Sequence, residues 1–184
     1  MGGKIRFNVA KFGAKVASQV SKFGFGSGNN LPGYVFYKIA GKEALKDLAH
    51  EMSIGPILIT GTNGKTTTTT LLIKLLSADT KIRKSFESNT IHAITTGILK
   101  GDGDLGVFEY GIRNKSYGIP DTVQRLIDPV GVVYTTISRE HSQVAGVKNP
   151  FEEYVDAKSL LSQGMTRGVV ISNADDPVTA NIAC

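Results

Sequence analysis

One run of glycine, lysine and threonine has the residue types that bind a nucleotide triphosphate. It reads Gly61-Thr62-Asn63-Gly64-Lys65-Thr66-Thr67 and continues with further threonines. Glycines let backbone N–H groups approach phosphate oxygens, a lysine supplies positive charge, and a threonine hydroxyl can bind Mg²⁺. A threonine-rich turn that contains Gly-Lys-Thr by chance is the alternative interpretation.

The residues on both sides of this run predict the strand and the helix that a phosphate-binding loop needs. Residues 56–60 are apolar and partly β-branched, which is typical of a buried parallel strand. Leucines at 71, 72, 75 and 76 recur at helical spacing after the run. A strand, a glycine turn and a helix N-terminus therefore meet at Lys65, where the helix dipole favours phosphate. The flanking pattern disfavours a chance turn.

The run is shorter than the Walker pattern G-x-x-x-x-G-K-[ST], because Ile59 stands five residues before Gly64. Its sequence resembles the ATP loop of the Mur ligase family, whose members join amino acids to cell-wall precursors. The same loop is found in the related folylpolyglutamate synthases. This resemblance covers about residues 56–179. Leu31-Pro32-Gly33 and the first fifty residues resemble the branch with the lipid II isoglutaminyl synthase ligase subunit and the archaeal pseudomurein peptide ligases. The resemblance to the Mur ligase family implies that residues 61–67 bind ATP and that Thr66 is also a magnesium ligand.

Two further residues are candidates for metal binding. Glu109 closes an apolar strand on the same side as Leu105 and Val107, so we expect it to face the crevice; a strand-end glutamate in water is the alternative. The family resemblance implies a magnesium ligand at Glu109 and, from the segment Ile137-Ser138-Arg139-Glu140-His141, a second-magnesium ligand at His141. Here the sequence departs from the family, with Gln143 in place of an aspartate and Thr136 in place of an asparagine.

Lys158 falls on an apolar helical stripe. The helix is expected to begin after an Asn149 cap with Pro150 at its first position, and Lys158 then shares a face with Phe151, Val155 and Leu161. A lysine on that face can extend its amine to water, find an anion or lose its charge. The segment Tyr154-Val155-Asp156-Ala157-Lys158 resembles the family segment whose lysine is carbamylated in many members. The resemblance also places Asn173, in Asn173-Ala174-Asp175-Asp176-Pro177, near the nucleotide; the two aspartates are alternatively turn and helix-cap residues.

Strands and helices alternate from residue 56 onward. Strands are expected at 56–60, 105–109, 130–135 and 168–171, with helices after the loop, at about 121–127 and after 149. This series predicts an α/β fold with a doubly wound, mostly parallel sheet of the P-loop type. We expect residues 1–50 to form an N-terminal amphipathic helix and a glycine-rich linker region. Residues 51–184 are expected to form a central ATP-binding domain that stops before its end and lacks a C-terminal domain.

The N-terminal extension is basic and amphipathic. Its lysines and one arginine lie largely off an apolar stripe of helical spacing. A glycine-rich segment, residues 24–30, follows the stripe, and we predict that this segment is flexible. Two interpretations stay open: the stripe packs on the domain or on a missing neighbour, or residues 4–23 contact a membrane surface. The stripe consists of Ile5, Val9, Phe12, Val16, Val20 and Phe23, and the basic residues are Lys4, Arg6, Lys11, Lys15 and Lys22.

Composition narrows the class of protein. The 184 residues are 41% hydrophobic, which suits one globular domain with an extension. The net charge of +5 belongs to residues 1–50, which hold eight basic and two acidic residues, and no nucleic-acid motif accompanies them. Cys184 is the single cysteine, and no run reaches the about 18 apolar residues of a spanning helix. We therefore expect a cytoplasmic protein that does not bind nucleic acid.

Together these residues predict a site for phosphoryl transfer with two divalent ions, and the resemblance implies an ATP-dependent acid–amino-acid ligase that uses Mg²⁺. The resemblance implies that ATP activates a carboxylate of a nucleotide- or lipid-linked peptide precursor as an acyl phosphate, and that an amino acid then displaces phosphate. Segments 108–113 and 139–141 favour pseudomurein peptide assembly over lipid II glutamate amidation. A P-loop GTPase or kinase is disfavoured because no D-x-x-G follows a strand. A non-catalytic nucleotide-binding module stays open, because a missing domain or partner chain is needed to complete a ligase.

Overall fold

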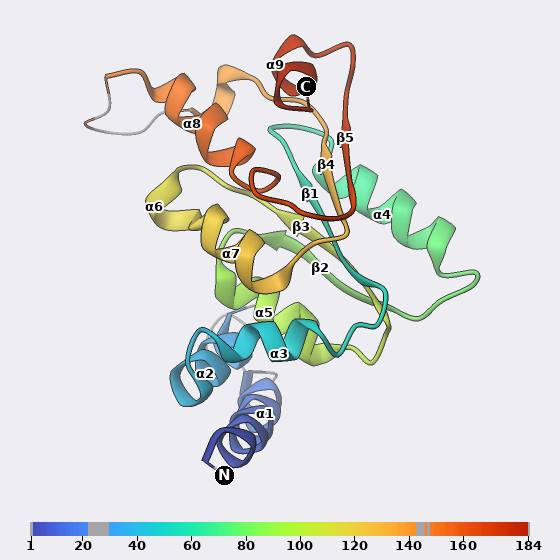
Figure 1. Ribbon diagram of the computed structural model, residues 1–184, viewed down its shortest axis with the longest axis vertical. Coiled ribbons are helices and arrows are strands. Elements are labelled where there is room, and N and C mark those ends of the chain that lie inside the picture. The colour runs from blue at the N-terminus through green and yellow to red at the C-terminus, as the bar shows by residue number, and fades with distance from the viewer. Residues whose placement is uncertain (1, 22–29, 143–145, 147, 184) are drawn as a thin grey trace.

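A five-stranded sheet forms the centre of the computed structural model, which describes residues 2–21, 30–142, 146 and 148–183. Neighbouring strands are parallel, in the order β2-β3-β1-β4-β5, and helices cover both faces (Figure 1). This confirms the predicted α/β fold with a doubly wound sheet. The strands are β1 (Gly55–Thr60), β2 (Ile82–Ser88), β3 (Leu105–Tyr110), β4 (Gly131–Tyr134) and β5 (Val169–Ser172).

Different helices bury the two faces of this sheet. On one face α4 (Lys65–Leu76) packs Ile73 against β1 and β3. The opposite face carries α5 (Ile91–Lys100), α7 (Pro120–Ile127) and α8 (Pro150–Ser159). Because side chains alternate along a strand, β3 sends Leu105 and Val107 toward α4 and sends Phe108 and Tyr110 to the other side. The short α6 (Lys115–Gly118), a 3-10 turn (Arg139–His141) and α9 (Pro177–Ala183) complete this part of the chain.

The sequence analysis does not predict β2 or α5. β2 is an edge strand in which buried and exposed residues do not alternate regularly, so its pattern lacks a period of two. α5 contains Thr95, Thr96 and Gly97, which have low helix propensity. Tertiary burial outweighs that propensity, because the isoleucines of α5 lie in the core and Thr90 caps its N-terminus by accepting a hydrogen bond from the Ala93 amide at 3.2 Å.

Two more helices, α2 (Leu31–Ala40) and α3 (Ala44–Ala49), follow the predicted N-terminal helix and precede β1. Phe36, Leu45 and Leu48 are fully buried in the same core as the helices of the sheet. Gly33 is the point of closest approach to α5, since a Cβ there would lie 2.0 Å from the His92 carbonyl oxygen. The division of the chain at residue 50 stays a prediction.

The predicted N-terminal helix is present as α1 (Gly2–Ser21), at the opposite end of the molecule from α8 and α9 (Figure 1). It packs on α2 through Ala10, Ala14 and Ala17, whose small side chains let the two helices approach. The large apolar residues face outward, so the alternative in which they pack on the domain is wrong for the described part of the chain, and packing on a missing neighbour stays a prediction. Lys22, Phe23 and the glycine-rich segment lie almost wholly outside the described residues. Among the described residues, no helix combines the length and apolar content that crossing a bilayer requires.

Candidate active site

The glycine run forms a tight loop between β1 and α4. Gly61 has φ +147°, and a Cβ there would lie 2.0 Å from the Thr135 hydroxyl oxygen. Gly64 has φ +81° and precedes the first residue of α4, Lys65. The backbone conformation favours glycine at both positions, and at Gly61 the segment just after β4 also leaves no room for a side chain. The predicted strand, turn and helix N-terminus therefore meet at Lys65.

Contacts from α8 and from the segment that follows β4 fix the shape of this loop. The Thr62 side chain is buried, accepts a hydrogen bond from the Ser138 amide at 2.9 Å and shares one of 3.2 Å with the Tyr154 hydroxyl. The Thr135 hydroxyl donates to the Asn63 carbonyl oxygen at 2.6 Å. Thr62 thus holds the loop with both its side chain and its backbone, because its amide also donates to the Thr136 carbonyl oxygen at 2.5 Å.

Thr66 and Glu109 bring two oxygen ligands together. The Thr66 hydroxyl donates to Glu109 Oε2 at 2.9 Å, and Glu109 is buried at the end of β3 on the side that faces α4. A hydroxyl and a carboxylate are ligands that Mg²⁺ prefers, so this pair fits the implied ion. No group of three or more carboxylate, histidine or cysteine side chains occurs among the residues whose side chains are described. His141 lies at the end of the 3-10 turn after β4, and its side chain is outside that description.

Lys65 is half-buried beside this pair. Its Nζ donates to the Thr62 carbonyl oxygen at 2.7 Å, so the amine folds back over the loop. Burial lowers the pKa of Lys65, and the negative charge of Glu109 partly opposes that effect.

Lys158 is a buried lysine whose amine lies close to the loop. Its side chain is fully buried, with Nζ 2.9 Å from the Ile112 carbonyl oxygen, 3.2 Å from that of Gly61 and 4.3 Å from the centre of the Tyr154 ring. Burial, and then the charge of Lys65, lower the pKa of Lys158 to about 7. The alternative in which this lysine extends to water is therefore wrong.

A cavity of about 240 Å³ joins these groups on one side of the loop. Lys65, Glu109 and Lys158 line it together with Arg113. A second hollow, of about 490 Å³, lies on the other side of the loop between Gly64 and Asn173. The predicted nucleotide-side residue Asn173 thus lies beside the loop but away from Glu109. The loop has one hollow with charged groups and one with mostly neutral ones.

The sequence model of the Mur ligase middle domain matches residues 59–183. The chain belongs to the Mur ligase family. It is 30% identical over 146 residues to the UDP-N-acetylmuramoyl-tripeptide--D-alanyl-D-alanine ligase of Bacillus subtilis, a match that covers 75% of this chain and 31% of that protein.

Two solved structures of Mur ligases resemble the fold. The MurF ligase of Thermotoga maritima in complex with ADP gives a TM-score of 0.60 at 19% identity and covers 77% of this chain and 34% of that one. A pseudomurein peptide ligase type C from Methanothermus fervidus gives a TM-score of 0.56 at 26% identity and covers 71% of this chain and 25% of that one. The chain thus spans between a quarter and about a third of the length of these relatives.

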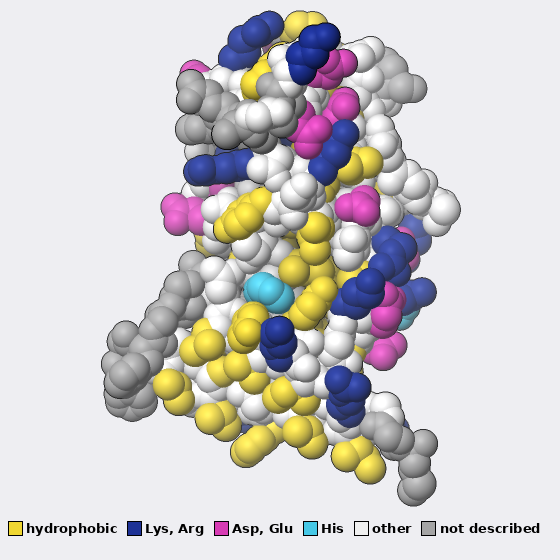
Figure 2. All heavy atoms as spheres, turned by 90° about the vertical axis from the view of Figure 1, so that its left-hand side faces the viewer, with side chains coloured by type: hydrophobic (Ala, Val, Ile, Leu, Met, Phe, Trp, Pro, Cys, Tyr) yellow, Lys and Arg dark blue, Asp and Glu magenta, His cyan; other side chains and the backbone are white. Residues whose placement is uncertain are grey.

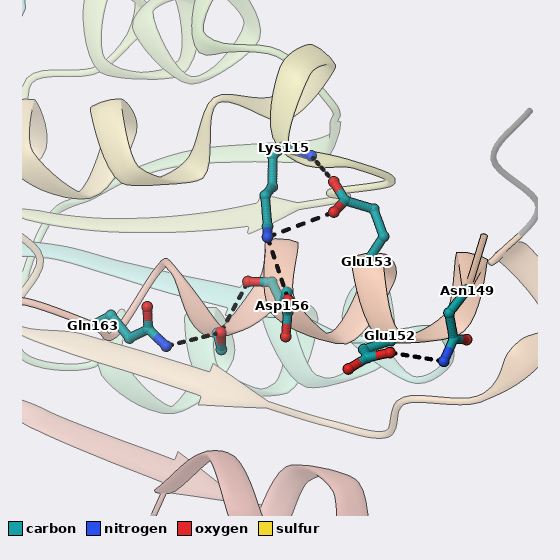
Figure 3. Close-up of polar contacts among 7 residues, drawn as sticks. Lys115, Asn149, Glu152, Glu153, Asp156 and Gln163 are labelled. Carbon is teal, nitrogen blue, oxygen red and sulfur yellow. Dashed lines mark hydrogen bonds and ion pairs between the residues drawn. The ribbon is translucent and has the colours of Figure 1, made fainter. Parts of the chain in front are cut away.

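In this Mur ligase middle domain, ion pairs on the outer face of α8 join that helix to α6. Lys115 Nζ, at the start of α6, lies 3.5 Å from Glu153 Oε2 and 3.3 Å from Asp156 Oδ2 (Figure 3). These ion pairs are solvent-exposed and contribute little stability, but they join α8 to α6 while its inner face carries Tyr154 and Lys158. Asn149 does not cap the backbone of α8 as predicted; its side-chain amide donates to Glu152 Oε2 at 2.7 Å.

Sequence reasoning missed several residues of the Mur ligase site. Tyr154 and Thr135 position the loop, and Arg113 lines the charged cavity. Arg113 follows the strand-end Glu109 by four residues, which is the signal that could have found it. Asp176 proves to be a structural residue, because it accepts hydrogen bonds from the Ile137 amide at 2.6 Å and from the Val178 amide at 2.9 Å. The cap interpretation of that aspartate is therefore confirmed.

Proposed function

We propose that the protein is an ATP-dependent amide ligase of cell-wall precursor synthesis. The observation that carries this proposal is the meeting of the Thr66 hydroxyl and the Glu109 carboxylate at 2.9 Å, at the mouth of a glycine loop that ends in Lys65. The ADP complex of the Thermotoga maritima relative supports ATP as the nucleotide. The protein acts in the cytoplasm, where ATP and the precursors meet.

In this reaction the chain positions charges rather than supplying covalent chemistry. The loop amides and Lys65 would bind the phosphates, and Thr66 with Glu109 would hold one Mg²⁺, which when bound would offset phosphate charge. His141 is the proposed ligand of a second Mg²⁺. A substrate carboxylate attacks the γ-phosphorus as ADP leaves, and an amine then attacks the acyl carbon as phosphate leaves. Asn173 and Thr67 complete the proposed nucleotide contacts.

Lys158 enters this proposal as a carbamate. A pKa of about 7 leaves much of the amine neutral near neutral pH, and a neutral amine reacts with carbon dioxide. In its present position Nζ donates to the carbonyls of Gly61 and Ile112, which would repel a carbamate. The modified side chain therefore has to turn toward Lys65 and the cavity, where its negative charge is matched.

The substrate we propose is a nucleotide- or lipid-linked peptide precursor, to which an amino acid is joined. Pseudomurein peptide assembly is the specific role that segments 108–113 and 139–141 favour, and the 26% identity to the Methanothermus fervidus ligase supports it. The Bacillus subtilis relative is named for a UDP-N-acetylmuramoyl tripeptide. A bacterial-type precursor is therefore the substrate against which a pseudomurein precursor should be compared. A further domain or a partner chain supplies the remaining substrate contacts.

Calorimetry with MgATP tests the nucleotide site. Lys65→Ala and Thr66→Ala should each weaken binding at least about tenfold, because each removes a contact to charged phosphate or metal. Thr70→Ala is the matched control, since Thr70 lies one turn further along α4 and its hydroxyl only donates to the Thr66 carbonyl oxygen at 2.8 Å. Unchanged affinity in both loop variants, with the fold intact by circular dichroism, would contradict the assignment.

A further inference from the structure

The exposed side of α1 is an apolar stripe without a partner among the described residues. It consists of Ile5, Val9, Phe12, Val16 and Val20, with exposed fractions between 43% and 70%. At 1.5 Å per residue the stripe is roughly 22 Å long. Figure 2 shows hydrophobic side chains gathered over the end of the molecule that α1 forms, with basic side chains among them. A continuous surface of this kind marks an interaction site rather than scattered surface residues.

Contacts on the opposite side of α1 hold this stripe outward. Ala10 and Ala14 pack on α2, the Arg6 side chain donates to the Ile39 carbonyl oxygen, and Lys11 Nζ lies 2.7 Å from Glu51 Oε1. Turning the helix to bury the apolar stripe would break the ion pair and put Phe12 where alanines now allow close approach. The protein therefore presents the stripe instead of sheltering it.

The charged residues of α1 itself are all basic. Residues 1–42 contain no aspartate or glutamate. By helical spacing, Lys4, Lys11 and Lys15 follow one flank of the stripe. On that flank a hollow of about 790 Å³ lies between α1, α2 and α5, with Lys11, Lys15 and Lys100 in its lining next to Phe12 and Leu99. A partner that covers this face must offer both an apolar layer and negative charge.

Other occupants match these features less well. In a second copy of the chain, two α1 helices in contact would bring basic residues together without any acidic residue of α1 to pair with them. The buried centres of protein interfaces are also depleted in lysine. A helix that lies in the surface of a bilayer has this composition, with lysine and arginine on its polar face and phenylalanine with aliphatic residues on the other.

We propose that the apolar stripe of α1 inserts into the surface of an anionic lipid bilayer, with lipid phosphates beside Lys15, while Lys11 keeps its ion pair with Glu51. The nucleotide loop contacts α8, which lies at the other end of the molecule from α1 (Figure 1). Binding through α1 therefore leaves the candidate active site open to solvent and holds it near the membrane.

Vesicle flotation of the full protein tests this proposal. Vesicles of equal parts phosphatidylcholine and phosphatidylglycerol should bind the protein, and vesicles of phosphatidylcholine alone should bind it weakly. Phe12→Ser with Val16→Ser should weaken binding about tenfold or more, because it removes the inserted apolar surface. Lys15→Glu should weaken it about fivefold or more, which corresponds to the attraction of one basic residue to an anionic surface.

Matched variants on α4 separate this effect from a general loss of apolar or basic surface. Leu71 and Leu75 are 56% and 73% exposed, so Leu71→Ser with Leu75→Ser is the apolar control and Lys74→Glu is the charge control. Both should leave binding unchanged. Absence of binding to anionic vesicles by the folded protein, or an equal loss in both pairs, overturns the proposal. So does a dimer in light scattering that Phe12→Ser with Val16→Ser abolishes, since a second copy would then cover the stripe. Neither arm uses nucleotide, so the result is independent of the proposed ligase activity.

Discussion

Helices α1 and α8 arise from the same kind of sequence pattern and end in opposite environments. Both have apolar residues at steps of three and four with lysines between or beside them. In α8 the lysine on the stripe, Lys158, is fully buried, whereas in α1 the large apolar residues are exposed and the alanines are buried. A period of 3.6 therefore identifies a helix and its faces, but it does not say which face is covered.

The elements around each helix explain the difference. α8 lies against the nucleotide loop through Tyr154 and against β4, whose Tyr134 hydroxyl donates to the Lys158 carbonyl oxygen at 3.0 Å. α1 packs mainly on α2. Where several elements surround a helix, even a lysine on it can be buried away from water. Where a helix has one main neighbour, only the side chains that face that neighbour are buried. The predictions below test this contrast, from the largest expected effect to the smallest.

The largest effect concerns the buried lysine of α8. In the full protein, Lys158→Ala should lower turnover by about 10- to 100-fold, because the proposed carbamate, which would orient the metal site, is lost. Formate or acetate should restore part of it by occupying the place of the carbamate. Lys15→Ala, on α1, is the matched exposed lysine and should leave turnover unchanged.

A second readout of the same prediction does not depend on activity. With ¹³C-labelled bicarbonate, carbon NMR should show a carbamate signal that Lys158→Met removes and Lys15→Ala retains. Full native turnover of Lys158→Ala without added acid would rule out the carbamate role.

The next effect compares the stability of two apolar truncations. Leu161, just after α8, is fully buried in the core, so Leu161→Ala should lower the free energy of unfolding by about 2–5 kcal/mol. Phe12→Ala on α1 removes a larger side chain, yet it should change that free energy by only about 0.5 kcal/mol, since Phe12 is exposed. Urea denaturation measures both. An equal loss would show that the stripe of α1 is covered within the folded chain.

The smallest effect is a pH dependence that should belong to α8 alone. The pKa of Lys158 is about 7 in the folded protein and near 10.5 when exposed, so between these values the unfolded chain binds more protons. The free energy of unfolding of the wild type should therefore rise with pH, relative to Lys158→Met, by at most about 1.4 kcal/mol per pH unit. Urea denaturation at pH 7.5 and 9.5 in buffer free of carbon dioxide, so that Lys158 is an unmodified amine, checks the sign. A flat difference would mean that Lys158 keeps its charge in the fold.

Local sequence predicted the parts of the protein whose signals are local. The loop from Gly61 to Lys65 needs glycines at its turns, and the strands before it and at β3 are short apolar runs. β2 and α5 escaped prediction because an edge strand alternates weakly and α5 is stabilised by burial rather than by propensity. The site roles of Arg113 and Tyr154 were not predicted, because these residues reach the loop from elements that are distant from it in the sequence.

The sequence by itself determined the glycine loop, the α/β alternation and the amphipathic character of α1, since each depends on residues close together in the chain. Only the tertiary structure decided that Lys158 loses water and that the stripe of α1 does not. Burial depends on what lies opposite a helix face, and residues distant in the chain supply it: Gly61 and Ile112 surround Lys158, while the stripe of α1 faces outward. The same type of pattern thus yields a perturbed lysine in one helix and an open apolar surface in the other.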